Sequence, residues 1–238
     1  MSKLTHTSFA LTLGVAAMLS ISACGTTQSS TEATDSPGGY LFERAATVHQ
    51  QVSRTGPATL REALPNHPGE YTKGSSTIKV KFSEDVVEGT VSSVTRDEAV
   101  IYDDTHLVND EPQAKIVDWD DPRADERTLM VTLRDVRSLS TDTVLPSVTF
   151  RIGVLVGSDP DQFADSVTSL RKVVVLLERR PDGRHQGEWM SALGAAGIGV
   201  VSSDDSVHFP GMGTHEASFT NGINTVTELR HEASAEAN

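Results

Sequence analysis

The sequence predicts a mainly β protein: a single antiparallel barrel, OB-like in form, or a small sandwich, with an N-terminal helix and one inserted helix. Short segments between residues 77 and 209 alternate apolar and polar residues, which is typical of strands with one buried face. Gly89 interrupts one of these segments, and a glycine inside a strand often marks a bulge. A helical segment at residues 160–170 stands between strands. These features suit an OB-like barrel, and the alternation alone leaves the sandwich open.

The first elements of the body are expected to be helical. Leu41, Ala45, Val48 and Val52 recur at spacings of four, three and four residues, which places them on one face of a helix that ends before Gly56. A second short helix is predicted over residues 59–64, followed by a loop over residues 65–74.

The β region that follows is predicted to hold seven or eight short strands. The five apolar residues 173–177 lie between charged residues and predict a strand buried on both faces. Turns are expected at residues 96–98 and 181–183, a hairpin loop at 203–206, and a last helix over residues 220–232. The expected strands span residues 77–82, 86–94, 99–102, 128–134, 148–156, 173–177, 197–202 and 207–209.

Composition narrows the classes of function. The chain has 238 residues, 37% of them hydrophobic and 22% charged, which suits a soluble globular body. Its formal net charge of −13 disfavours binding to nucleic acid and to anionic lipid surfaces. The single cysteine, Cys24, excludes disulfides within the chain and zinc sites built from cysteines. We therefore expect no cofactor, no metal and no nucleic-acid partner.

The N-terminal segment resembles the leader of a bacterial lipoprotein. Lys3 precedes an apolar run at residues 9–21, too short for a bilayer core that needs about 20 apolar residues. Ile21, Ser22, Ala23 and Cys24 are similar to a lipobox, in which the first three residues form the signal-peptidase recognition site and the cysteine becomes the lipidated first residue. The alternatives are an ordinary signal peptide and a cysteine of the core, but the polar residues 25–39 after it offer no core.

This resemblance implies a cell-membrane protein that is lipid-anchored at the extracytoplasmic face. The expected division is a signal peptide at 1–23, a lipidated cysteine and flexible tether at 24–39, a helical lead-in at 40–74, a β-barrel or sandwich at 75–213 and a polar, partly helical tail at 214–238. Residues 86–91, Val-Val-Glu-Gly-Thr-Val, also resemble a strand that opens a β-barrel in uncharacterised secreted domains of high-GC Gram-positive bacteria. That second resemblance implies a fold and no activity.

The acidic segment 118–126 is the first candidate site. Asp118, Asp120, Asp121, Asp125 and Glu126 offer hard oxygen ligands for Ca²⁺, and Trp119 could dock a sugar or peptide. The spacing lacks the glycine and the closing glutamate of an EF-hand loop. A solvated loop between strands, with Trp119 lying over the barrel edge and Arg123 paired with a neighbouring acid, is the interpretation we favour.

Two further clusters have ordinary structural explanations. Asp159, Asp161 and Asp165 surround the start of the helix at Pro160, where acids cap the backbone and complement the helix dipole. His208, His215 and Glu216 hold potential zinc ligands, but they do not match the H-E-x-x-H motif, and the intervening Pro-Gly-Met-Gly predicts a loop.

Short enzymatic motifs are matched only in part. Residues 169–172 fit S-x-x-K without the S-D-N and K-T-G motifs that accompany it in penicillin-binding proteins. Residues 194–199 do not form G-x-G-x-x-G. The favoured function is thus a non-enzymatic binding or interaction module of the cell envelope, with an envelope protein or glycan as partner. The alternatives are a metal-assisted hydrolase using residues 118–126 or His208 and His215, and a small-ligand carrier using the barrel interior.

Overall fold

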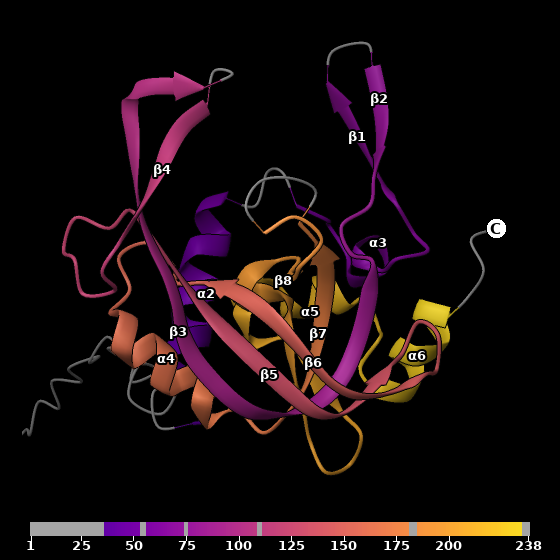
Figure 1. Cartoon of the computed structure of the whole chain (residues 1–238). Coiled ribbons are helices and arrows are strands. Elements are labelled where there is room, and N and C mark those ends of the chain that lie inside the picture. The colour runs from indigo at the N-terminus through magenta and orange to yellow at the C-terminus, as the bar shows by residue number, and fades with distance from the viewer. Residues whose placement is uncertain (1–35, 53–55, 74–75, 109–110, 181–184, 235–238) are drawn as a thin grey trace, which may run out of the picture.

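The computed structural model describes residues 36–52, 56–73, 76–108, 111–180 and 185–234. Two strand hairpins extend away from a body of curved strands and short helices (Figure 1). The elements in chain order are α2 (Gly39–Val52), α3 (Leu60–Ala63), β1 (Gly69–Lys73), β2 (Ser76–Val80), β3 (Asp85–Val108), β4 (Glu111–Val117), β5 (Glu126–Ser138), β6 (Val144–Gly153), α4 (Pro160–Ser169), β7 (Lys172–Arg179), β8 (Trp189–Ser191), η1 (Gly194–Gly197), β9 (Ile198–Val201), β10 (Val207–His208), η2 (Pro210–His215), α5 (Glu216–Thr220) and α6 (Val226–Ser234).

Five strands close into a barrel. The sheet runs β10-β9-β7-β8-β6-β5-β3-β4, and an additional pairing of β7 with β3 closes β3, β5, β6, β8 and β7 into a ring. The ring is antiparallel except where β6 meets β8, which it pairs in parallel at Arg151 and Met190. Taken around the ring, the strands come first, second, third, fifth and fourth in the chain, with α4 between the third and the fourth. The barrel prediction is confirmed, and its connectivity is OB-like.

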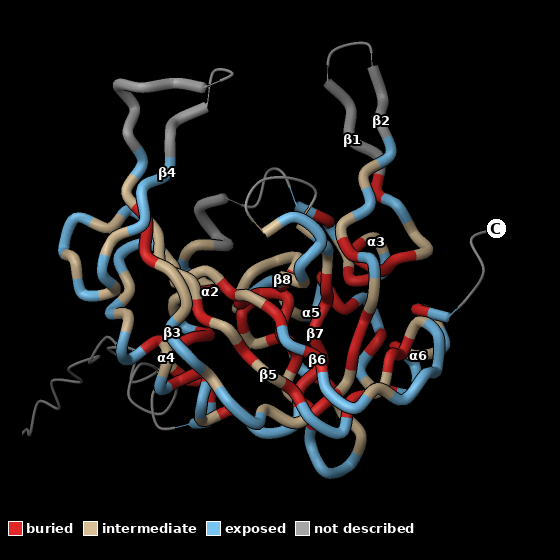
Figure 2. The backbone as a smooth tube through the Cα atoms, in the orientation of Figure 1, coloured by how far each residue is buried: buried red, intermediate tan, exposed pale blue. Residues whose placement is uncertain are grey.

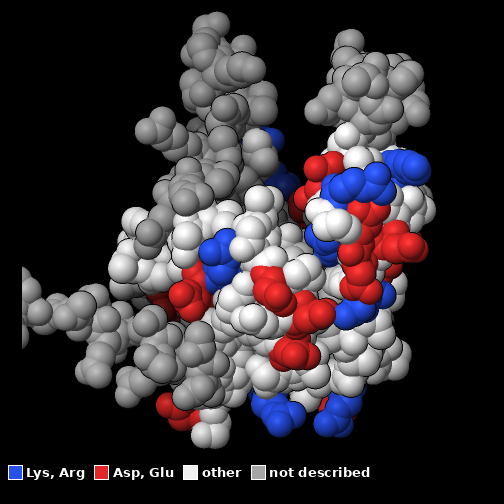
Figure 3. All heavy atoms as spheres, turned by 90° about the vertical axis from the view of Figure 1, so that its left-hand side faces the viewer, with Lys and Arg blue, Asp and Glu red and all other residues white. Residues whose placement is uncertain are grey.

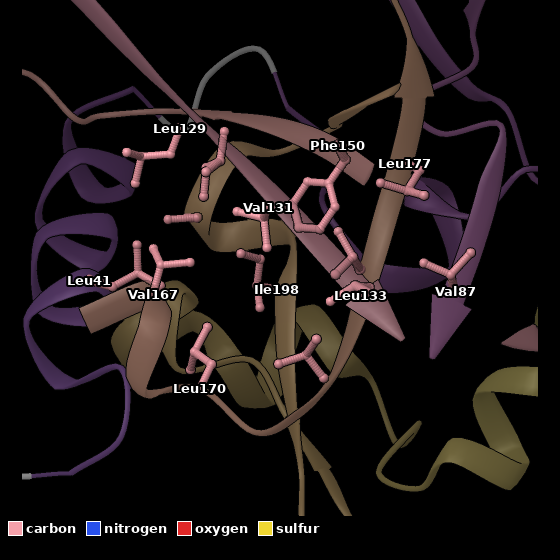
Figure 4. Packing of buried hydrophobic residues seen from close by; sticks show 14 of the residues in the cluster. Leu41, Val87, Leu129, Val131, Leu133, Phe150, Val167, Leu170, Leu177 and Ile198 are labelled. Carbon is pink, nitrogen blue, oxygen red and sulfur yellow. The ribbon is translucent and has the colours of Figure 1, made fainter. Parts of the chain in front are cut away.

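The barrel interior is filled by apolar side chains. Phe150 and Val131 from neighbouring strands point toward Ile198 and Leu133, and α2 and α4 cover one end with Leu41 and Val167 (Figure 4). Each fully buried side chain of this size stabilises the fold by about 1.5–3 kcal/mol. The predicted inner face of the strand at Phe150 is therefore correct, since Phe150 is only 2% exposed.

A second apolar cluster lies outside the barrel, under the C-terminal elements (Figure 2). Strand β7 serves both clusters: Val173, Val175 and Leu177 face the barrel interior, whereas Val174 and Leu176 face outward. The prediction of a strand buried on both faces is confirmed. The outer cluster takes its remaining buried members from the short helices α3, η1, η2, α5 and α6, from strands β3, β9 and β10, and from residues that follow or join these elements and β5, namely Leu60, Ala63, Leu64, Val86, Leu139, Ala196, Val201, Val207, Phe209, Met212, Phe219, Ile223, Val226, Leu229 and Ala233.

The N-terminal and inserted helices are joined by hydrogen bonds. Ser166 Oγ accepts from Leu41 N at 2.9 Å, and Ser169 Oγ accepts from Gly38 N at 2.7 Å. Gly38 has φ +76°, and a Cβ there would lie 2.6 Å from Leu170 Cδ2, so only glycine fits. Helix α4 begins as predicted, with Asp159 as its N-cap.

Strand β3 is longer than the sequence suggested. The turn predicted at residues 96–98 is wrong, because β3 continues through these residues to Val108. Its register against β5 shifts between Arg96 and Ala99, so a bulge accommodates the polar residues that resembled a turn. The register also shifts opposite Gly89, but the bulge predicted at that glycine is on the partner strand: between Arg134 and Arg137, β5 has one residue more than β3 has between Glu88 and Thr90.

Other local predictions need correction. Residues 69–73 of the predicted loop form β1, because β2 supplies a strand partner for them. The alternation expected through Val156 ends at Gly153, and Val156 is 84% exposed. The loop predicted between His208 and His215 is largely the short 3-10 helix η2. The turn predicted at residues 181–183 lies outside the described residues.

The C-terminal segment is part of the packed body. Helix α6 lies within and just beyond the predicted helix at residues 220–232, and its Val226 and Leu229 are buried together with Ile223.

No helix that the structure describes is long and apolar enough to cross a bilayer.

Candidate functional site

A cleft of about 580 Å³ lies against the outer side of the barrel, where three of its strands end. This volume is within the range of small-molecule sites, about 300–1,000 Å³. Segments far apart in the chain line it, from α2 to the residue that begins η1. The lining residues are Val48, Tyr102, Asp125, Glu126, Thr128, Arg151, Gly153, Val154, Leu155, Val156, Glu178, Arg180, His185, Glu188, Trp189, Met190, Ser191, Ala192 and Gly194.

The floor of the cleft is a row of three residues on adjacent strands. Met190 on β8 pairs with Arg151 on β6 and with Glu178 on β7. Neighbours in the chain, such as Phe150 and Leu177, fill the barrel interior. Because side chains alternate along a strand, the three residues of the row face outward into the cleft.

Arg151 is held between two carboxylates. Its Nη1 lies 2.6 Å from Glu188 Oε2, and its Nη2 donates to Asp97 Oδ1 at 3.2 Å. Its Nε lies 2.9 Å from Asp97 Oδ2, which also accepts a hydrogen bond of 3.0 Å from Thr128 Oγ1. The side chains of Arg151 and Asp97 are only 13% and 11% exposed, so water screens their attraction little.

His185 extends this network across the mouth of the cleft. Its Nε2 lies 2.9 Å from Glu98 Oε2, and its Nδ1 lies 3.3 Å from Glu188 Oε2. The network therefore joins β3, β6 and the segment before β8, and fixes that segment over the floor.

Of the carboxyl groups that line the cleft, Glu178 has the pKa shifted furthest from its ordinary value. Burial raises its pKa to about 7, and the nearby negative charge of Glu84 adds to the shift. It has no hydrogen-bond or ion-pair partner among the described residues. Near neutral pH this group is therefore poised between its two protonation states.

Tyr102 and Glu126 form the opposite wall. The phenol donates to Glu126 Oε2 at 2.5 Å, and this hydrogen bond, with burial, raises the pKa of Tyr102 to about 12. The positive charge of Arg180, which also lines the cleft, acts on the pKa of the same phenol in the opposite direction. Tyr102 N donates to Asp125 Oδ2 at 2.8 Å.

Chemically, the cleft combines charged groups fixed in position with an apolar surface. Met190, Leu155 and Ala192 supply apolar area for a ligand body. Ser191 is the one serine among the lining residues, and its Oγ donates to Gly194 O at 2.6 Å. Among the residues that the structure describes, no three His, Cys, Asp or Glu side chains are grouped to hold a metal ion.

The predicted acidic loop lies beside this cleft and is organised by arginine. Arg127 donates to three carbonyl oxygens of the loop, those of Trp119, Asp121 and Ala124, at 2.8, 2.6 and 3.3 Å. Arg123 pairs with Asp121, as predicted, and its hydrogen bonds hold the pKa of that carboxyl at about 2.

The remaining acids of the loop are used separately. Asp125 and Glu126 bind Tyr102 in the wall of the cleft, whereas Asp120 lies 3.5 Å from Arg96. Trp119 packs against the edge of the interior cluster beneath Arg96. The pairing of Arg123 and the position of Trp119 at the barrel edge are those expected for a loop between strands.

We expect Ca²⁺ to leave the stability of the protein unchanged relative to Mg²⁺. The loop carbonyls that could bind a cation already accept from Arg127. A genuine site at a hundredfold excess over Kd would add about 2.7 kcal/mol, or several degrees in Tm. Thermal unfolding at millimolar Ca²⁺ and matched ionic strength measures this. A calcium-specific rise that disappears in Asp120→Asn/Asp121→Asn would contradict the expectation.

The other predicted clusters do not converge on a site. Asp159 caps α4 and Asp161 lies 2.5 Å from Arg96, while Asp165 is exposed. His208 Nδ1 lies 3.5 Å from Glu216 Oε1, which chiefly accepts from Phe209 N at 2.6 Å.

Neither short motif gains support from its surroundings. Ser169 binds Gly38 at the end of α4, and Lys172 pairs with Glu88. Residues 194–197 form η1 and precede β9. Ile21, Ser22, Ala23 and Cys24 lie outside the described residues.

Sequence reasoning missed the central residues of the cleft. Arg151 is 54 positions from Asp97 and 37 positions from Glu188. His185 is 87 positions from Glu98, and no local motif links these partners. Arg151 and Glu178 stand out only as charges in or next to apolar strands. That signal could have marked them as candidates, but not as neighbours.

Fold and site together define a class: an OB-like β-barrel with a ligand-sized cleft outside the barrel. OB-like barrels commonly bind ligands on their second and third strands and on the loops beside them, and those elements contribute Thr128, Arg151, Glu126 and His185 here. Comparison with protein-family models, curated proteins and solved structures finds no match for this chain.

Proposed function

We propose that this protein is a membrane-anchored lipoprotein whose barrel binds a small ligand, or one segment of a larger envelope molecule, in the outer cleft without transforming it. The observation that carries the proposal is the cleft itself. An ion-pair network of Asp97, Arg151, Glu188 and His185 fixes its walls in the absence of ligand, and preorganised walls lower the cost of binding.

The position of the cleft favours binding at the outer side of the barrel over a carrier that uses the barrel interior. Side chains such as Phe150 and Val131 fill the barrel interior, so a ligand is better accommodated outside. Among the described residues on the face shown in Figure 3, Lys and Arg are scattered among Asp and Glu and form no continuous basic patch. An envelope peptide or glycan suits this surface better than a phosphate backbone.

The enzyme alternative rests on different residues from those the sequence suggested. His185 contacts two glutamates, and Glu178 titrates near pH 7, so proton transfer within the cleft is chemically accessible. The residues first considered for a hydrolase, at 118–126 and at His208 and His215, serve local structure.

A survey of soluble envelope glycan fragments and short peptides tests the binding function. We expect at least one compound to raise the Tm of the wild type and to be recovered intact. Met190→Arg, which fills the cleft, should abolish the rise. Ser147→Arg, a matched change at an exposed position of β6, should retain it. Equal responses of both variants would contradict the cleft as the site, and conversion of a compound that is lost in His185→Gln would favour the enzyme.

The membrane anchor rests on Cys24, the only thiol of the chain. Cys24→Ala is expected to abolish lipid labelling and to leave an uncut precursor, because no other side chain accepts the diacylglyceryl group. Metabolic labelling with palmitate and measurement of precursor mass provide the test. Normal labelling of Cys24→Ala would contradict the anchor.

A further inference from the structure

Two charged side chains in the cleft have no partner in the described part of the chain. Asp125, Glu126, Arg151, His185 and Glu188 each make at least one hydrogen bond or ion pair there. Glu178 and Arg180 make none among the described residues, although both line the cleft.

These two residues share one side of one strand. Glu178 lies in β7, and Arg180 follows the strand directly, its N–H donating to Glu188 O at 3.0 Å. Residues two apart along a strand are about 7 Å apart and point the same way. The structure shows no ion pair between them. The negative charge of Glu84 raises the pKa of Glu178, and the positive charge of Arg180 acts on the pKa of Tyr102. An anion and a cation thus stand open to the same space.

A ligand that fills the cleft has to satisfy both charges. Excluding water from an unpaired charge is costly unless the ligand supplies a partner. A simple amine would satisfy Glu178 and isolate Arg180, and a simple carboxylate would do the reverse. Met190, Leu155 and Ala192 offer apolar contact for the body of the ligand.

We propose that the cleft binds a small zwitterion, an α-amino acid or short peptide, with its ammonium group on Glu178, its carboxylate on Arg180 and its apolar side chain on Met190 and Leu155. This assignment rests on the proposed binding function and names its ligand class.

The titration of Glu178 supports this assignment. Its carboxyl pKa, raised to about 7, records a site where negative charge lacks compensation. An ammonium group bound beside Glu178 supplies the compensating positive charge and favours the ionised carboxylate. Binding at neutral pH should therefore release protons from Glu178. Glu84, from the segment before β3, is the charged group that acts on this pKa. The other charged or titratable groups that line the cleft are Tyr102 from β3, Asp125 and Glu126 at the start of β5, Arg151 from β6, Arg180 after β7, and His185 and Glu188 before β8.

Three matched probes test the proposal by calorimetry: L-leucine, isopentylamine, which lacks its carboxylate, and 4-methylpentanoate, which lacks its ammonium group. We expect wild-type protein to bind leucine about tenfold or more tighter than either analogue, because each analogue leaves one charge unpaired. Since the ionised fraction of Glu178 rises about tenfold between roughly pH 6 and pH 8, leucine affinity should rise by about the same factor.

Two variants separate the two contacts. Glu178→Gln should bind leucine no better than wild type binds 4-methylpentanoate, and should lose the pH dependence. Arg180→Gln should bind leucine no better than wild type binds isopentylamine. Asp165→Asn, which removes an exposed acid on α4 outside the cleft, should behave as wild type.

Stability provides a check on folding. A raised carboxyl pKa means that the stability supplied by protonated Glu178 is present at about pH 4 and is lost as pH rises through about 7. Glu178→Gln should therefore melt above wild type at pH 8 and level with it at pH 4, so weak binding by this variant is not explained by unfolding.

Several results would overturn the zwitterion assignment. These are equal affinities for leucine and one analogue, equal losses for all three probes in both variants, or no saturation by any probe up to roughly 10 mM. If an envelope compound still binds wild type and fails to bind Met190→Arg, the proposed function stands and only the ligand class is wrong.

Discussion

Phe150→Asp will unfold the protein at neutral pH. Phe150 is 2% exposed and projects into the barrel interior, where it pairs with Val131 on β5 and lies near Leu133. Truncating a buried phenylalanine costs about 3–5 kcal/mol, and burying an unpaired carboxylate adds several more. The sum approaches the whole stability of an ordinary domain, about 5–15 kcal/mol.

Circular dichroism and urea unfolding measure this effect. Thr149→Asp, one position along the same strand but exposed, is the matched control and should remain folded with a shift within about 1 kcal/mol. A cooperative transition for Phe150→Asp, at a denaturant midpoint close to that of the control, would show that the strand faces the opposite way.

The sequence carried enough information to predict the barrel because most of its strands bury one face. The alternation of Val148, Phe150 and Ile152, and the unbroken apolar run of β7, follow directly from their burial. A long strand with bulges is harder to recognise, because the polar residues that a bulge accommodates resemble a turn. For this reason the sequence predicts a turn at residues 96–98, where β3 is continuous.

The strand that closes the barrel had no sequence signal. Strand β8 has three residues, too few for a periodic pattern, and it pairs with β6 through Met190 alone. The barrel is closed only because this contact and the pairing of β7 with β3 are both made. Tertiary packing of the segments on either side of β8, rather than strand propensity, therefore determines closure.

The cleft could not be predicted for a related reason. Its walls come from segments that meet only after the ring has closed, and the chemistry of Arg151 depends on partners 54 and 37 residues away. Residues 118–126 form a candidate site in the sequence because their acidic residues are close together along the chain. In the structure, Arg123 and Arg127 neutralise or occupy much of that loop, whereas Glu178 and Arg180 find no side-chain partner among the described residues.

Arg151→Met should destabilise the protein by about 2–4 kcal/mol. The substitution keeps a long apolar stem but leaves Asp97, which is 11% exposed, without its cation. Breaking a fully buried pair by removing one partner costs about 3–5 kcal/mol, and the slightly exposed position of this pair lowers that figure. Because Arg151 also binds Glu188, the segment carrying His185 should loosen over the cleft, and ligand binding should weaken beyond the effect on stability.

Urea unfolding of two further variants isolates the cause. Arg134→Met makes the same change on neighbouring β5, where the arginine is 63% exposed beside Asp135, and exposed pairs contribute at most about 1 kcal/mol. Asp97→Asn/Arg151→Met removes both charges and should be more stable than the sum of its single changes predicts, by about 0.5–3 kcal/mol. Equal losses for Arg151→Met and Arg134→Met would mean that water screens the cleft network fully. In that case the rigidity ascribed to the walls, and the low cost of binding that follows from it, would have to come from the apolar contacts of Met190 and Trp189 instead.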